Sequence, residues 1–90
     1  MSMPVLSMFY GLIVRMYWEK DGRHSLPHIH VKHAEFEVVL TLEGEVLEGD
    51  LPPPKMKLIQ AWIELHREEL KINWELASNN QDTFRIEPLR

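Results

Sequence analysis

The sequence contains no cysteine among its 90 residues. Disulfide bonds and thiolate metal sites are therefore excluded, and a metal would need histidine or carboxylate ligands. The longest apolar runs extend over only a few residues, which excludes a transmembrane helix of about 20 residues. The start of the chain also lacks the basic flank and apolar stretch of a signal peptide. We expect a cytoplasmic protein of bacterial type without a membrane anchor and without a cofactor.

A broad cationic surface is also absent, since the formal net charge is −4. Phosphate binding depends on such a surface, so a uniformly basic nucleic-acid-binding protein is disfavoured. The charge is nevertheless uneven. Residues 10–33 carry a net charge of +2 and four of the five histidines, whereas residues 34–51 carry −6 and no lysine or arginine. This acidic lobe is either a solvated face or a surface for a basic partner.

Size and composition indicate a single globular domain over residues 1–90. Hydrophobic residues make up 44% and charged residues 27% of the chain, an ordinary globular mixture. A chain this short buries only a modest core, so a partner protein or a homodimer would add to its stability.

Residues 10–49 show the alternation of apolar and polar side chains that is typical of strands. In the segment 10–18 the apolar face consists of Leu12, Val14, Met16 and Trp18. Arg15 and Tyr17 then lie on the opposite face. Segments 35–42 and 45–49 continue the pattern after short turns. The predicted product is an antiparallel meander of three to five strands.

Residues 53–78 follow a row of prolines and show helical spacing of their large apolar residues. The apolar stripe slips between Leu65 and Leu70, which indicates two helices joined near His66 or one bent helix. Trp62 and Trp74 are expected to anchor the core. We therefore predict an α+β fold in which one or two C-terminal helices cover one face of the meander, with a possible final strand at residues 83–87.

The stretch HSLPHIHVKH, residues 24–33, contains a histidine-rich motif. Ile29 and Val31 are expected to face the core, so His28, His30 and Lys32 face away from it. If residues 10–18 pair with 28–33, these histidines share one face with Arg15 and Tyr17. Cross-strand neighbours have Cβ atoms about 4.5–5.5 Å apart, so their side chains would touch.

Glu37 on the next predicted strand joins the same face. A histidine, an arginine and an orienting carboxylate are the groups that acid–base chemistry on a phosphodiester would use. We therefore take His28, His30, Arg15 and Tyr17 as candidate catalytic residues. Glu37, Lys32 and His24 are the candidate binding residues.

Two other interpretations of the histidines remain open. They can form an ordinary solvated sheet face. Alternatively, His28 and His30 can bind a metal, with His24 or Glu37 as a third ligand. The HxH pair alone is a weak signal for a metal, so we assign no metal ligand.

Several motifs resemble a small bacterial family, domain of unknown function 4160. The first are Met3-Pro4, Phe9-Tyr10-Gly11, Arg15-Met16 and Pro27-His28-Ile29-His30-Val31. The later segment EGDLPPPKMKLIQAWIELHREELKINWELA and the closing IEPL also resemble the family. The chain departs from it in having Leu26 where the family has proline and a longer loop before that position.

The resemblance implies a component of a toxin–antitoxin pair. In this family the gene often lies next to one that encodes a second small protein. The resemblance therefore implies a cognate partner protein, with RNA or DNA as a target. Some members are described as transcriptional regulators. The leading hypothesis is action on RNA through the histidine and arginine face. The alternatives are a non-enzymatic protein-binding or regulatory module and a metal-binding protein.

Overall fold

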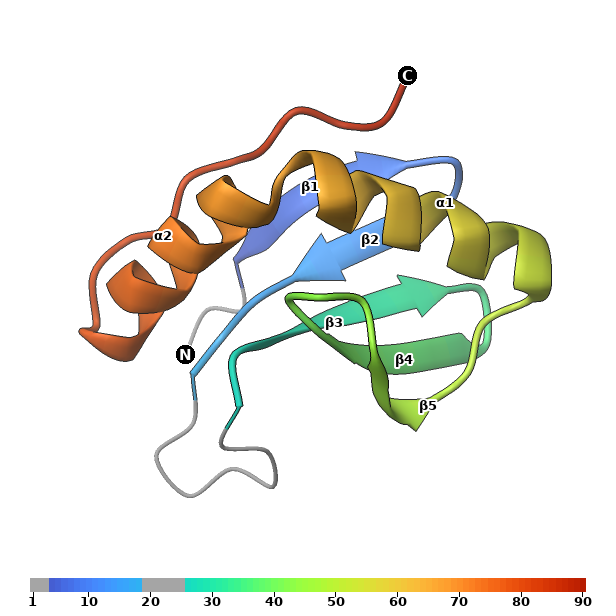
Figure 1. The fold of residues 1–90 in the computed structure, drawn as a ribbon, viewed down its shortest axis with the longest axis horizontal. Coiled ribbons are helices and arrows are strands. Elements are labelled where there is room, and N and C mark those ends of the chain that lie inside the picture. The colour runs from blue at the N-terminus through green and yellow to red at the C-terminus, as the bar shows by residue number, and fades with distance from the viewer. Residues whose placement is uncertain (1–3, 19–25) are drawn as a thin grey trace.

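The computed structural model describes residues 4–18 and 26–90. Within these described residues, five strands come first: β1 (Val5–Phe9), β2 (Leu12–Arg15), β3 (His28–His33), β4 (Phe36–Thr41) and β5 (Val46–Gly49). Two helices follow, α1 (Pro53–Leu65) and α2 (Arg67–Ser78). The strands form one antiparallel sheet in the order β1-β2-β3-β4-β5, and the helices cover one of its faces (Figure 1). The predicted α+β meander is therefore confirmed, with five strands and two helices.

The first hairpin differs from the prediction. Tyr10 and Gly11 form a two-residue turn in which both residues have positive φ, 48° and 78°. Such a turn matches the twist of paired strands, so β1 pairs with β2 across it. The prediction that a strand begins at Tyr10 is wrong by two residues, and β1 was not predicted. The Tyr-Gly turn lies inside a run of β-favouring residues, which concealed it.

The predicted pairing of the second and third strands is confirmed. Arg15 lies opposite His30 and Val14 opposite Val31 in an antiparallel register. The apolar face is confirmed for Leu12, Val14 and Met16, which are buried. Trp18 is the exception, with 40% of its surface exposed. β2 ends at Arg15, so the strand alternation no longer fixes the side of the sheet on which Trp18 lies.

The core lies between the sheet and the helices. Trp62 is fully buried and its ring lies 5.5 Å from that of Phe9 on β1. Trp74 packs against the same core while remaining partly exposed. The helices meet at His66, whose φ of −121° and ψ of 25° interrupt the helical backbone. This confirms the expected junction and explains the slip in the apolar stripe.

β5 is an edge strand whose backbone approaches β4 closely. A register shift between Val39 and Leu40 places Glu48 opposite Val39. At Gly49, φ is +82° and an added Cβ would lie 2.1 Å from the carbonyl oxygen of Glu37. A side chain cannot be accommodated there, so Gly49 is required for this pairing.

The predicted final strand at residues 83–87 is wrong. The segment after α2 instead runs back beside the helices (Figure 1), and Ile86 donates one backbone hydrogen bond of 2.8 Å to Leu6 on β1. The indole of Trp62 donates to the carbonyl of Glu87. Pro88 cannot donate to a strand ladder, so the segment is fixed by single contacts. Neither described helix is both long and apolar enough to cross a bilayer.

Candidate functional site

The candidate site lies on the sheet face opposite the helices, here called the outer face. The strand register places Arg15 on β2, His30 on β3 and Val39 on β4 side by side. The sequence-predicted neighbours Arg15 and His30 are therefore brought together. Glu48 on β5 extends the row because it lies opposite Val39.

Tyr17 and His30 form the centre of this site. Their rings are stacked, with centroids 4.3 Å apart and planes 13° from parallel. The Tyr17 hydroxyl lies 3.3 Å from Nδ1 of His30. The stacked ring and this polar contact both bear on the orientation of the His30 ring.

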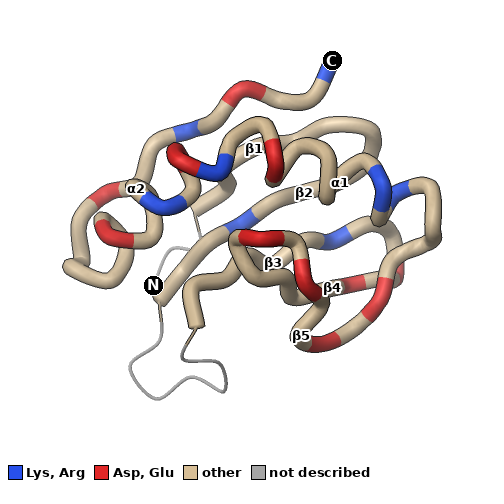
Figure 2. Tube along the Cα trace, viewed as in Figure 1, with Lys and Arg blue, Asp and Glu red and all other residues tan. Residues whose placement is uncertain are grey.

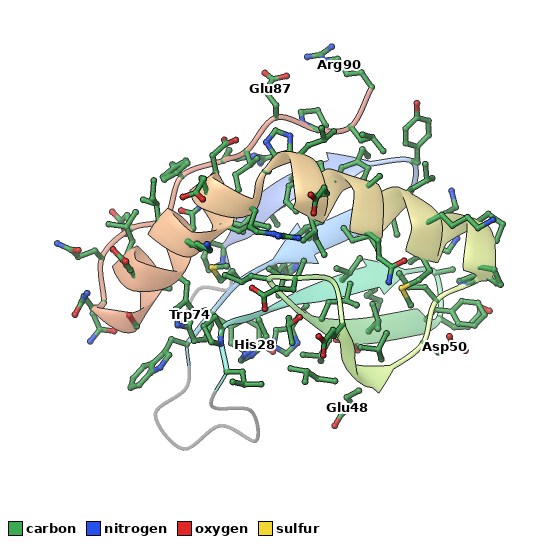
Figure 3. The ribbon with its side chains drawn as sticks, in the orientation of Figure 1. His28, Glu48, Asp50, Trp74, Glu87 and Arg90 are labelled. Carbon is green, nitrogen blue, oxygen red and sulfur yellow. The ribbon has the colours of Figure 1, made fainter. Side chains whose placement is uncertain are left out.

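The environment of His28 differs from the one predicted. It lies at the start of β3 with only 7% of its surface exposed. Its ring lies 5.1 Å from His30 in an edge-on arrangement and 5.1 Å from the ring of Trp74. Figure 3 shows Trp74 beside His28 at the end of the sheet. The strand alternation places His28 on the outer face, but Trp74 covers its ring, so the interpretation of a solvated sheet face does not hold for His28.

The proton on the His28 ring can be placed. Its Nδ1 lies 2.6 Å from the carbonyl oxygen of Leu26. A carbonyl only accepts hydrogen bonds, so Nδ1 carries a hydrogen and donates it. His28 thus ties the segment that enters β3 to the aromatic cluster made by Tyr17, His30 and Trp74.

A pocket of about 260 Å³ opens on the outer face beside these rings. Its lining consists of Tyr17, His30, Glu37, Val39, Glu48 and Gly49. The predicted residues Tyr17, His30 and Glu37 therefore do share one surface. The carboxylates of Glu37 and Glu48, both on exposed residues, give the pocket an acidic rim. Such a rim repels phosphate, so a phosphate group would be held nearer to Arg15.

Charge is segregated over the described residues. The six acidic residues of the stretch 34–51 are all exposed, and they cluster on β4, β5 and the adjoining turns (Figure 2). Arg15 and Lys32 lie on the neighbouring strands. Lys32 is exposed and pairs across the sheet with Glu37. Lys32 therefore lies beside the site, across the strand pair from an acidic residue.

The remaining predicted residues do not form a metal centre in the described part of the chain. No group of three histidine or acidic side chains comes together there in a way that could hold a metal ion. His24 lies outside the described residues, as do Lys20 and Arg23.

Trp74 and Glu48 were not predicted as parts of the site. Trp74 was interpreted as a core anchor, although it also contacts His28. Glu48 reaches the outer face through the register shift in the β4–β5 pair. A simple count of alternating positions does not detect such a shift.

The fold and this surface define a small α+β domain that carries a histidine and aromatic cluster on its meander sheet. The family model described as Domain of unknown function (DUF4160) matches residues 11–75, and the chain belongs to that family. The match includes Arg15, Tyr17, His28 and His30 but neither β1 nor the segment after α2. Comparisons with curated proteins and with solved structures gave no match.

Proposed function

We propose that this protein is a small component of a toxin–antitoxin pair that acts on RNA, and that the outer face recognises the RNA. The observation that carries the proposal is the stacked pair of Tyr17 and His30 directly beside Arg15. Aromatic rings exposed on a sheet stack with unpaired bases, and an arginine beside them contacts phosphate. The toxin–antitoxin association follows from the family resemblance.

The burial of the imidazoles favours recognition over proton transfer in this conformation. His28 is almost fully buried, and His30 is half-buried with its Nε2 atom fully buried. A general base must reach the proton that it removes, within about 2.6–3.2 Å. The histidines are therefore assigned to positioning: His28 supports His30, and His30 supports Tyr17. Arg15 and Tyr17 are the residues expected to touch RNA.

The test compares the wild type with Arg15→Gln and Tyr17→Ala in binding a labelled single-stranded RNA. Arg15→Gln removes one phosphate contact. It is expected to reduce the slope of log affinity against log salt concentration by about one. Loss of a stacking ring is expected to weaken binding by about 1–3 kcal/mol. Lys57→Gln, an exposed change on α1, serves as the charge control. Equal affinity of all four proteins for RNA would overturn the proposal.

The same proteins test the toxin–antitoxin assignment in a bacterial host. Induced expression of the wild type is expected to arrest growth. The folded double variant, Arg15→Gln with Tyr17→Ala, is expected to permit growth. The double change His28→Ala with His30→Ala distinguishes cleavage from recognition. Cleaved RNA in the wild type but not in a folded histidine variant that still binds RNA would show that the histidines transfer protons. Growth without arrest for the wild type would contradict a toxic role for this component of the pair.

A second candidate, a protein-binding module, is favoured by the acidic lobe. β5 is at the edge of the sheet, and the acidic residues next to it are exposed. An edge strand can pair with a strand of another protein, and here the charge would select a basic one. Co-expression with the product of the neighbouring gene tests this. Glu45→Lys with Glu48→Lys is expected to abolish co-elution, whereas Glu64→Lys with Glu68→Lys on the helices leaves it unchanged.

A further inference from the structure

A second, larger pocket lies where the chain leaves β2. It has a volume of about 500 Å³, within the range of about 300–1,000 Å³ that small-ligand sites occupy. One wall contains Met16, Tyr17 and Trp18, and the other contains Gln81, Asp82 and Thr83 from the segment after α2. The pocket therefore combines an aromatic and apolar wall with a wall of amide, carboxylate and hydroxyl groups.

The polar wall is held in place by the way in which α2 ends. Asn80 adopts a left-handed conformation with φ of 58°. The backbone N–H of Asn80 donates to Ala77, and that of Gln81 donates to Leu76. These two bonds form a Schellman motif, which ends a helix at a fixed angle. Further along, the side chain of the fully buried Asn73 holds both backbone groups of Phe84. The wall is thus formed before any ligand arrives.

Tyr17 connects this pocket to the outer face. It lines the larger pocket here, and it also lines the smaller pocket beside His30. A ligand that contacts the outer face can therefore extend around Tyr17 into the larger pocket. Trp18 also lines the larger pocket and is 40% exposed, so its ring is accessible for stacking.

We propose that the larger pocket receives one base of single-stranded RNA, with guanine preferred. This inference rests on the proposed function and names the substrate of the same surface. An aromatic wall stacks against the face of a base, and polar groups opposite read its edge. Asp82 excludes a phosphate from this wall by its charge, so the backbone lies on the Arg15 side of Tyr17.

The preference for guanine follows from the hydrogen-bonding groups. Asp82 is the one acidic residue of the lining, and an ionised carboxylate only accepts hydrogen bonds. Guanine presents two adjacent donors, N1–H and the N2 amino group, which fit the two carboxylate oxygens. No other RNA base offers such a pair of neighbouring donors on its pairing edge. Asp82→Asn keeps the shape and replaces one acceptor with a donor.

The experiment measures binding of two fluorescent oligouridylates, one with a single central guanosine and one without. The guanosine is expected to tighten binding to the wild type by about tenfold or more, the scale of a good base-specific contact. Asp82→Asn is expected to remove this preference while retaining the affinity for plain oligouridylate. Trp18→Ala is expected to weaken binding of the guanosine-containing oligonucleotide by roughly tenfold or more. Tyr10→Ala, which removes an exposed ring at the far turn of the sheet, is the control.

The outcomes separate this inference from the function on which it rests. If both oligonucleotides bind equally well, and Trp18→Ala and Asp82→Asn change nothing, the pocket inference is overturned and RNA recognition stands. If neither oligonucleotide binds, the proposed function fails and takes the inference with it. Guanosine monophosphate is titrated alone as a third probe. If guanosine monophosphate binds and neither oligonucleotide does, the ligand of the pocket is a free nucleotide and not a base of RNA. That outcome overturns the proposal.

Discussion

Asn73 on α2 and Phe84 beyond it form two reciprocal hydrogen bonds. The side-chain amide donates to the carbonyl of Phe84 at 3.0 Å, and the backbone N–H of Phe84 donates to Oδ1 of Asn73 at 2.9 Å. Asn73 is completely buried. Asn73 therefore holds the segment after α2 against this helix, because Phe84 alone provides a partner for both the donor and the acceptor of its buried amide.

We expect Asn73→Ala to lower the free energy of unfolding by about 2–3 kcal/mol, since two backbone groups lose their partners. Lys71→Ala, an exposed change on the same helix, is expected to change it by less than about 0.5 kcal/mol. Urea denaturation followed by circular dichroism measures both. Equal stability of the two variants would show that solvent replaces the Asn73 hydrogen bonds.

Gly44 in the turn before β5 and Gly49 at the end of β5 give a matched pair. Gly44 and Gly49 both have positive φ, +91° and +82°, yet an added Cβ would be 3.7 Å from its nearest neighbour at Gly44 and 2.1 Å at Gly49. We expect Gly44→Ala to cost about 1–3 kcal/mol from backbone strain alone. Gly49→Ala is expected to cost clearly more and to detach β5. Thermal unfolding measures the two stabilities, and similar losses would argue against the close approach of β4 and β5.

His28 is expected to contribute to stability through its packing and its hydrogen bond. His28→Ala removes the ring contact with Trp74 and leaves the carbonyl of Leu26 without its donor. We expect a loss of about 2–3 kcal/mol in the free energy of unfolding. His28→Asn, whose amide can still donate to Leu26, is expected to lose less. A wild-type melting temperature for His28→Ala would show that the ring is not held as described.

Metal binding offers a further test of the histidine motif. Since the described residues form no group of three ligands, we expect zinc or nickel to leave the melting temperature unchanged. A metal that binds the folded state alone would raise it, and a chelator would reverse the rise. A reversible increase that is lost in His30→Ala would restore the metal-binding interpretation and would require a ligand in residues 19–25.

Much of the architecture was predictable from periodicity. The pairing of Arg15 with His30 followed from two alternating segments and a connection between them. The helix junction at His66 followed from a slip in the apolar stripe. Both depend on local patterns that repeat over many residues, and such patterns are the strongest signals in a single sequence.

The parts that escaped prediction depend on single residues or on distant contacts. The turn at Tyr10 and Gly11 depends on two positive φ values, which the sequence does not display. The burial of His28 depends on Trp74, a residue on another element. The same holds for the segment after α2, whose path is set by Asn73 and Trp62. Tertiary contacts of this kind have no periodic signature.

The backbone hydrogen bond from Ile86 to Leu6 affects how the chain folds and how it resists aggregation. Every strand of the meander pairs with its neighbour in sequence, so the sheet is built from local contacts that form rapidly. Because the segment after α2 contacts both β1 and the helices, we expect it to dock after they have formed. Until it does, β1 is an open edge, the kind of surface on which protein chains associate with one another. We therefore expect the segment after α2 to limit association at this edge, and its removal to become visible first as precipitation.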